Sequence, residues 1–235
     1  MPNLEVLYED NHLIVVVKEE NLLSQKDITE DEDILSLVKA YLKEKHQKLG
    51  NVYLGLVHRL DRRVGGVMVF AKTSKAASRL SEAIRERDFE KKYLAICTGK
   101  IESGILKHKL IKKDQMALES KEGKEAVLEY KVIKYLKEEG LDYTLVDVDL
   151  ITGRYNQIRA QFALIGHPLI NDFKYGYQGK NYFDQLGLWC YELKVPHPIT
   201  KEQMSFKKIP EGGIWSFKQG ARDEKQENLN YRDCN

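Results

Sequence analysis

The sequence predicts an α+β protein built on a mixed, largely antiparallel sheet with flanking helices. Segments with the apolar or alternating pattern of strands outnumber those with helical periodicity. Several strand segments also follow one another with no helix between them, as residues 105–113, 125–136 and 141–150 do. Glu139-Gly140 marks the turn between the last two of these. Runs of adjacent strands with helices set apart are typical of the α+β class.

In the first part of the chain, residues 4–8 and 12–18 predict a hairpin that turns at Asp10-Asn11. Asp31 or Asp33 is placed to cap a helix to about residue 46, and Ser74 to cap another to about residue 87. Strands are expected at 52–57 and 67–71. The helices are expected to bury one face each, formed by Leu35, Val38 and Leu42 in the first and Ala77, Leu80 and Ile84 in the second.

In the second part, residues 90–99 predict a strand, and the polar residues 116–124 a loop or short strand. Residues 156–165 predict a short helix closed by Gly166-His167-Pro168. From residue 219 onward the chain is polar and charged. We therefore expect one folded domain over residues 1–218 and a mobile tail over residues 219–235.

The composition excludes several classes of protein. Hydrophobic residues make up 42% and charged residues 31%, as in ordinary globular proteins. No apolar run approaches the ~20 residues of a membrane span, and the N-terminus lacks a signal-peptide pattern, so the cytoplasm is expected. The three cysteines are far apart, and neither metal-ligand spacings nor phosphate-binding glycine loops occur, so we expect no disulfide, metal or cofactor.

The charge is unevenly distributed although the net charge is only +2. Basic residues gather at positions 59–72 and again at Lys107, Lys109, Lys112 and Lys113, while acids gather at positions 30–33. A local basic face is compatible with phosphate contacts, and equally with a solvated surface.

One acid stands among cations. Asp61 has His58 and Arg59 before it and Arg62 and Arg63 after it, and an apolar strand follows. The residues alone leave two interpretations open. Asp61 is either a turn residue in a structural ion pair or a carboxylate that neighbouring arginines keep ionised as a nucleophile.

The segment His-Arg-Leu-Asp at residues 58–61, with Gly66 and the strand ending Ala-Lys-Thr at 71–73, resembles the signature of the RluA-type pseudouridine synthases. That resemblance assigns the nucleophile to Asp61. The Lys-x-Tyr-x-Ala segment of the family matches residues 91–95, so Tyr93 is expected to pack on the target uracil and is a candidate for proton transfer. The residues alone also allow Tyr93 to be a half-buried strand tyrosine.

A second stretch matches the family at Gly153, Arg154, Gln157, Ile158 and Arg159 and at residues 166–168. The resemblance implies that Arg159 pairs with the nucleophile. If the resemblance is set aside, two interpretations of Arg154 and Arg159 stay open: they bind a phosphate near the helix N-terminus, or they are ordinary surface charges. The chain departs from the family at Asn156 and Gln161, which replace histidines, and at Val64-Gly65, which replaces Thr-Ser. These departures indicate a divergent branch.

The resemblance covers residues 4–217 with gaps and implies the pseudouridine synthase catalytic fold, in which uridine in structured ribosomal or transfer RNA is isomerised without a cofactor. Arg59 is expected to hold the space that the extruded base leaves, and His58, Arg154 and Gln157 to shape the pocket or its RNA rim. We expect a monomer without a preceding S4 module. Two rivals remain: a non-catalytic RNA-binding or ribosome-assembly factor on the same fold, and a hydrolase that uses an Asp nucleophile.

Overall fold

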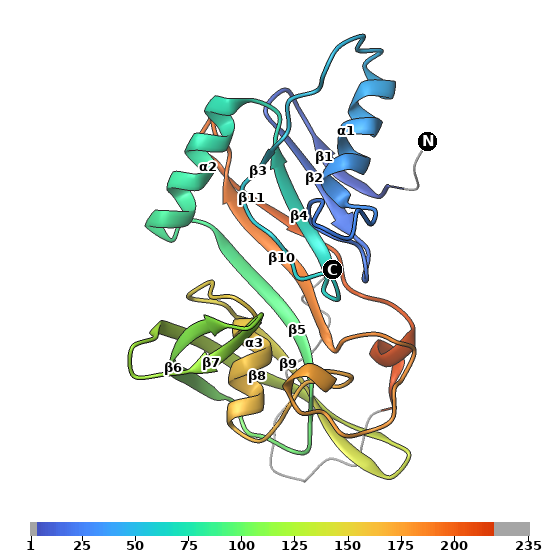
Figure 1. Ribbon diagram of the computed structural model, residues 1–235, viewed down its shortest axis with the longest axis vertical. Helices are drawn as coiled ribbons and strands as arrows, with labels where there is room; N and C mark the ends of the chain where they lie inside the picture. The colour runs from blue at the N-terminus through green and yellow to red at the C-terminus, as the bar shows by residue number, and fades with distance from the viewer. Residues whose placement is uncertain (1–3, 219–235) are drawn as a thin grey trace. The chain divides into compact units, whose positions relative to one another are not determined.

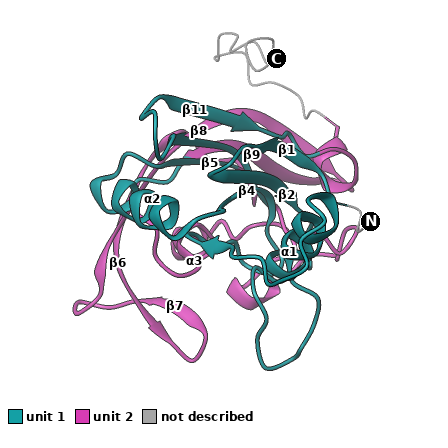
Figure 2. Ribbon diagram, turned by 90° about the horizontal axis from the view of Figure 1, so that it is seen from above, with its two compact units in different colours: residues 1–93, 149–151, 188–210 teal, residues 94–148, 152–187, 211–235 magenta. Residues whose placement is uncertain are grey.

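The computed structural model describes residues 4–218 and divides into two compact units (Figures 1 and 2). The described residues of unit 1 are 4–93, 149–151 and 188–210, and those of unit 2 are 94–148, 152–187 and 211–218. The chain passes from unit 1 to unit 2 inside strand β5 (Glu90–Thr98). The tail predicted at residues 219–235 lies outside the described residues.

Unit 1 is organised around two strands that are buried along their whole length, β2 (Leu13–Lys18) and β4 (Gly65–Ala71). They pair antiparallel, and β1 (Val6–Glu9) completes the predicted hairpin with β2. On the other edge of β4 lie β3 (Gly55–Leu56), antiparallel, and β10 (Leu188–Pro196), parallel; β11 (Gln203–Lys207) pairs with β10. Gly66 is required where β10 meets β4, because its φ is +127° and a Cβ there would lie 2.2 Å from the carbonyl oxygen of Cys190.

Two helices flank these strands on one face (Figure 2). Helix α1 (Ile34–Lys45) is capped by Asp33, which accepts a hydrogen bond from Ser36 N, as one of the two predicted caps. Helix α2 (Ser74–Glu86) is capped by Thr73 and not by Ser74, since the Thr73 hydroxyl reaches Ala76 N. Both buried faces differ by one or two positions from the prediction, and consist of Ile34, Val38 and Leu42 in α1 and Ala76, Leu80 and Ala83 in α2.

The strand predicted over residues 52–57 is limited to β3, because only Gly55 and Leu56 find partners on β4. The next N–H along that edge of β4, that of Val69, donates to the imidazole Nε2 of His58 at 3.1 Å. A side chain thus takes the place of the strand backbone where the chain leaves the sheet.

Unit 2 holds the later antiparallel strands in the order β5-β9-β8-β6-β7. These are β6 (Gly104–Lys113), β7 (Met116–Glu119), β8 (Lys124–Glu138) and β9 (Leu141–Asp149), close to the predicted limits. The predicted short helix is α3 (Gln157–Leu164), and two 3-10 turns follow, η1 (Phe173–Tyr175) and η2 (Gly213–Ser216). The predicted α+β class with a mixed, largely antiparallel sheet is confirmed.

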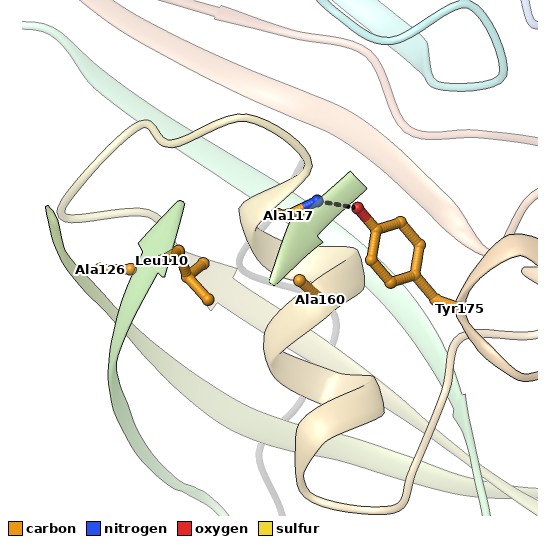
Figure 3. Close-up of a cluster of buried hydrophobic side chains, with 5 residues drawn as sticks. All are labelled: Leu110, Ala117, Ala126, Ala160 and Tyr175. Atoms are coloured by element: carbon orange, nitrogen blue, oxygen red, sulfur yellow. Dashed lines mark hydrogen bonds between the residues drawn. The ribbon is translucent and has the colours of Figure 1, made fainter. Parts of the chain in front are cut away.

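Small residues allow α3 to lie directly on β6, β7 and β8. Ala117, Ala126 and Ala160 meet there with Leu110 and Tyr175 in one buried cluster (Figure 3). The Tyr175 hydroxyl accepts a hydrogen bond from Ala117 N at 2.8 Å. Tyr175 therefore fixes β7 to the η1 turn as well as filling the core. None of the helices within residues 4–218 has the length and apolarity needed to cross a membrane.

Glu9 is a hub between the elements of unit 1. Its carboxylate is 8% exposed and contacts Lys45 at 2.8 Å, His46 at 2.7 Å and Lys72 at 2.7 Å, which tie the end of β1 to the last turn of α1 and the end of β4. Burial alone raises the pKa of Glu9, but the three hydrogen bonds outweigh it and lower that pKa to about 2. The hub therefore stabilises the fold through the ionised form of Glu9.

We predict that Glu9→Gln lowers the free energy of unfolding at pH 7 by about 1–3 kcal/mol. Because the folded-state pKa lies below the usual 4.5, the wild-type advantage is complete above pH 4.5 and disappears as the pH falls through about 2. Urea unfolding at a series of pH values measures this. Glu44→Gln, on an exposed position of α1, is the control and is expected to stay within about 0.5 kcal/mol; a gap for Glu9→Gln that persisted at pH 2 would contradict the assignment.

Candidate active site

Asp61 lies in the loop between β3 and β4, where its own turn orients the carboxylate. The residue is half-buried. Its Oδ1 accepts a hydrogen bond from Arg63 N at 3.0 Å, and its carbonyl oxygen accepts one from Val64 N at 3.0 Å. This is an Asx turn, in which the side chain bonds the backbone two residues on. The carboxylate is thereby held in place before any substrate arrives.

A buried lysine anchors the Asp61 loop. Lys18, at the end of β2, is 0% exposed. Its Nζ donates to the carbonyl oxygens of Glu19 at 2.9 Å, Leu22 at 2.7 Å and Arg62 at 3.1 Å. Burial lowers the pKa of Lys18 to about 7, and the charge of Asp61 is the largest of the influences that raise it again. In its protonated form, Lys18 thus carries a positive charge that interacts with the charge of the candidate nucleophile.

Ser24 fastens the same loop from a second side. Its hydroxyl donates to the Leu60 carbonyl at 2.7 Å and accepts from Leu60 N at 3.1 Å, and it is 6% exposed. Sequence reasoning did not single out Lys18 or Ser24. The available signal was a charged residue that ends an otherwise apolar strand, Leu-Ile-Val-Val-Val-Lys.

The cations next to Asp61 in the sequence have different surroundings. Arg62 extends to the exposed Asp31, with 2.6 Å between Nη1 and Oδ2. Arg59 is exposed, and Arg63 contributes its backbone N–H to the Asp61 turn. His58 is 8% exposed and accepts from Val69 N, and burial lowers its pKa to about 3, so the imidazole is neutral at physiological pH. His58 therefore supports the loop from inside.

Tyr93 belongs to the part of β5 that lies in unit 1. Its side chain is 6% exposed, more buried than expected of a half-buried strand tyrosine. The hydroxyl donates a hydrogen bond to the Cys190 thiol of β10. Burial and the nearby thiol raise the pKa of Tyr93, so the phenol is neutral at physiological pH. The partner Cys190 is 0% exposed and is a third residue that sequence reasoning did not single out for the site.

In unit 2, Arg159 is held by a bidentate ion pair with Asp172. Its Nε and Nη2 donate to the two carboxylate oxygens at 2.7 and 2.6 Å, and the two side chains are 5% and 0% exposed. The guanidinium lies 5.0 Å from the ring centre of Tyr175. A planar guanidinium clamped on one edge and stacked on a ring has little freedom to rotate. The remaining N–H groups of Arg159 lie outside this ion pair and point in fixed directions.

Gln157 closes the loop before α3. Its Oε1 accepts from the Thr152 hydroxyl at 2.8 Å and from Arg154 N at 2.9 Å, and its Nε2 donates to Val127 O and to Gln161. Gln157 is 2% exposed, whereas Arg154 is exposed and donates from Nε to the Glu125 carbonyl at 2.8 Å. Gln157 therefore supports the loop from inside, whereas Arg154 is a cation at the surface.

Gln161, one of the departures from the family pattern, is completely buried and fully used. Its amide nitrogen bonds the carbonyl oxygens of Leu106 and Ala126 on two strands. Asn156, the other position where the family has a histidine, precedes α3 with a left-handed φ of +46° and makes no side-chain cap bond. Gln161 thus acts as a bridge between α3 and the sheet of unit 2.

Each unit carries part of the predicted set: Asp61, Tyr93, His58 and Arg59 in unit 1, and Arg154, Gln157 and Arg159 in unit 2. All seven lie in the part of the chain that matches a known protein family. The model of the RNA pseudouridylate synthase family matches residues 12–164, which include every one of them. No group of three or more His, Cys, Asp or Glu side chains among the described residues is arranged to hold a metal ion.

Among curated relatives, the ribosomal large subunit pseudouridine synthase D of Vibrio cholerae is 31% identical over 223 residues, covering 86% of this chain and 66% of the relative. The dual-specificity RNA pseudouridine synthase RluA of Haemophilus influenzae is 33% identical over 214 residues, covering 87% and 92%. The chain thus spans slightly less than two thirds of the first relative and nearly all of the second.

Solved structures agree at the level of fold. Human RNA pseudouridylate synthase domain containing 1 matches with a TM-score of 0.72 and 19% identity, covering 88% of this chain and 84% of the other. The family match and the curated relatives together establish that the chain belongs to the RNA pseudouridylate synthase family, as an RluA-type member. The resemblance seen in the sequence is confirmed.

We predict that Asp172→Asn lowers the free energy of unfolding by about 3–5 kcal/mol, because it leaves the buried charge of Arg159 without its carboxylate. Glu139→Gln removes a carboxylate from the exposed pair with Lys180 in the same unit and is the control, expected to cost under about 1 kcal/mol. Denaturant unfolding monitored by tryptophan fluorescence compares the two. Equal losses for both variants would show that the Arg159–Asp172 pair is not a structural clamp.

Proposed function

We propose that the chain is an RNA pseudouridine synthase that isomerises uridine to pseudouridine in ribosomal or transfer RNA, with Asp61 as the nucleophile. The observation that carries the proposal is the Asp61 loop itself. A carboxylate fixed by its own Asx turn, on a loop anchored by buried Lys18 and Ser24, lies inside the matched family segment. The names of relatives support the substrate class: one is the ribosomal large subunit pseudouridine synthase D described above, and another is the tRNA pseudouridine synthase C of Vibrio parahaemolyticus, 31% identical over 225 residues.

In this reaction the bond between C1′ and N1 of uridine breaks, the uracil turns, and C5 bonds to C1′ of the same sugar. C5 gives up its proton and N1 ends with one, so no redox change, hydrolysis or external donor is involved. What the protein must supply is an ionised carboxylate, a pocket that excludes water and a site for the extruded base. No cofactor is required by this balance.

We assign Arg159 the role of holding Asp61 ionised and oriented during the reaction. The bidentate pair with Asp172 and the ring of Tyr175 support this assignment, because they fix the direction of the guanidinium. A preorganised cation costs no rearrangement when charge moves at the nucleophile. Tyr93 is assigned to stack on the uracil, and its neutral hydroxyl, held by Cys190, is the candidate for moving a proton.

Contacts with RNA are assigned to the exposed members of the predicted set, Arg59 and Arg154, whose charges can reach phosphates. His58 and Gln157 are buried, so their assigned part is to shape the pocket behind the rim. Arg59 is further proposed to hold the space left by the extruded uridine. We propose that the protein works as a cytoplasmic monomer on structured RNA.

We predict that Asp61→Asn lowers the rate of product formation by several orders of magnitude, as loss of a nucleophile does, while RNA affinity changes by less than about threefold. Asparagine can keep the Asx turn because its Oδ1 also accepts from Arg63 N. The assay measures tritium released from RNA labelled with [5-³H]uridine, since C5 loses its hydrogen.

Asp27→Asn is the matched control, because Asp27 also forms an Asx turn, with Thr29 N at 2.8 Å, but is exposed. It is expected to retain full activity. Substantial tritium release by Asp61→Asn would show that Asp61 is not the nucleophile. RNA binding without release by the wild-type protein would favour the non-catalytic RNA-binding factor.

A further inference from the structure

The cluster of lysines at residues 107–113 divides between the two faces of β6. Side chains alternate along a strand, and Leu106, His108 and Leu110 point toward α3, with Leu106 and Leu110 buried and His108 contacting Gln161 at 3.0 Å. Lys112 continues this row. Lys107 and Lys109 lie on the opposite face, where their cross-strand neighbours are Val127 and Glu125.

Lys112 meets an exposed aromatic ring at the point where its row passes the start of α3. Its Nζ lies 4.6 Å from the ring centre of Tyr155, and both side chains are exposed, Tyr155 at 38%. Tyr155 directly precedes Asn156, whose left-handed φ turns the chain into α3. The residues after this bend, Gln157 to Arg159, are buried, and those before it, Gly153 to Tyr155, are exposed. The bend therefore keeps the Tyr155 ring at the surface of unit 2.

Arg154, which directly precedes Tyr155 in the chain, adds a second exposed cation. Its backbone N–H is fixed by Gln157 and its Nε by the Glu125 carbonyl, so the guanidinium is anchored without an acid as partner in these bonds. A tyrosine ring that contacts a lysine and follows an exposed arginine in the chain combines a stacking surface with charges for phosphates. We call Lys112, Arg154 and Tyr155 the β6–α3 platform.

We propose that the β6–α3 platform binds an unpaired stretch of the RNA substrate, with one base stacked on Tyr155 and neighbouring phosphates on Lys112 and Arg154. This inference rests on the proposed function and assigns to it a contact made by residues outside the predicted site, Lys112 and Tyr155. Unpaired RNA is the occupant because a ring can stack only on an exposed base face, and duplex RNA covers its base faces. The two cations would also attract an acidic protein surface. An exposed aromatic ring that can stack on a base favours RNA over such a protein.

The test measures binding of the full chain to a fluorescein-labelled 12-nucleotide oligouridylate at several salt concentrations. Stacking of one base on an aromatic ring is worth about tenfold in affinity, so Tyr155→Leu is expected to weaken binding by about that factor without changing the salt dependence. Tyr155→Phe retains the ring and is expected to bind like the wild type. Lys112→Gln is expected to weaken binding and to reduce the slope of log affinity against log salt by about 0.7, the value for one phosphate contact on a single strand.

Lys107→Gln is the matched control, since it makes the same change on the same strand but on the other face. It is expected to leave affinity within about twofold of the wild type. Tyr155→Leu is expected to leave the affinity for a 12-base-pair RNA duplex unchanged. Thermal unfolding midpoints of all variants confirm that binding is compared between folded proteins.

A direct measurement is photocrosslinking to the same oligonucleotide made with 4-thiouridine. Trypsin cleaves after Arg154 and Arg159, so a contact on the ring places the crosslink in the peptide 155–159. Unchanged affinity for Tyr155→Leu together with no crosslink in that peptide would overturn the proposal, as would equal losses for Lys107→Gln and Lys112→Gln. Because these experiments read binding and not isomerisation, a failure of the tritium assay would remove the proposed function and leave the platform in place.

Discussion

The arrangement around Asp61 depends on the buried ammonium group of Lys18. An ammonium has three hydrogens, and three carbonyl oxygens, those of Glu19, Leu22 and Arg62, accept them. These carbonyls belong to two loops that are far apart in the sequence, so one side chain at the end of β2 holds both. Burial opposes the charge and lowers the pKa of Lys18 to about 7, while the charges of Asp61, Glu20 and Glu19 favour it. An apolar residue at this position would leave buried carbonyl groups without donors.

Unit 2 also contains a buried basic side chain, but its partner is a carboxylate instead of backbone carbonyl groups. Arg159 and Asp172 are both buried and form a bidentate ion pair, and the guanidinium lies 5.0 Å from the ring centre of Tyr175. The Tyr175 hydroxyl also holds β7, so the clamp on Arg159 and the cluster shown in Figure 3 share one residue. In both units, then, a basic side chain is buried and donates hydrogen bonds to oxygen atoms of the protein. The cations proposed to contact RNA are other residues, the exposed Arg59, Arg154 and Lys112.

Local sequence patterns were sufficient for most of the fold. The hairpin at Asp10, the cap at Asp33 and the turn at Glu139-Gly140 depend on residues close in the chain, and all three are present. The short β3 was not predictable, because its length is set by which N–H groups of β4 are still open and by His58 taking the next one. The choice of Thr73 over Ser74 as a cap is a one-residue difference that both side chains allow.

The site divides in the same way. Motifs predicted Asp61, Tyr93 and Arg159 as site residues, whereas the contacts of Lys18 with the Asp61 loop and of Asp172 with Arg159 emerge only from the three-dimensional structure. The lysine cluster shows that residues close together in the sequence need not share one surface. Lys107, Lys109 and Lys112 looked like one basic patch, and strand alternation separates them onto two faces. Net charge and clustering therefore said less about RNA contacts than the direction of each side chain does.

The most direct test of the account maps pseudouridines by carbodiimide-dependent primer extension in total RNA from cells with and without this gene. The account predicts that at least one pseudouridine disappears when the gene is removed. It should return with the wild-type protein and stay absent with Asp61→Asn. Restoration of the site by Asp61→Asn, or no change at any position, would contradict the claim that Asp61 is the nucleophile of an RNA pseudouridine synthase.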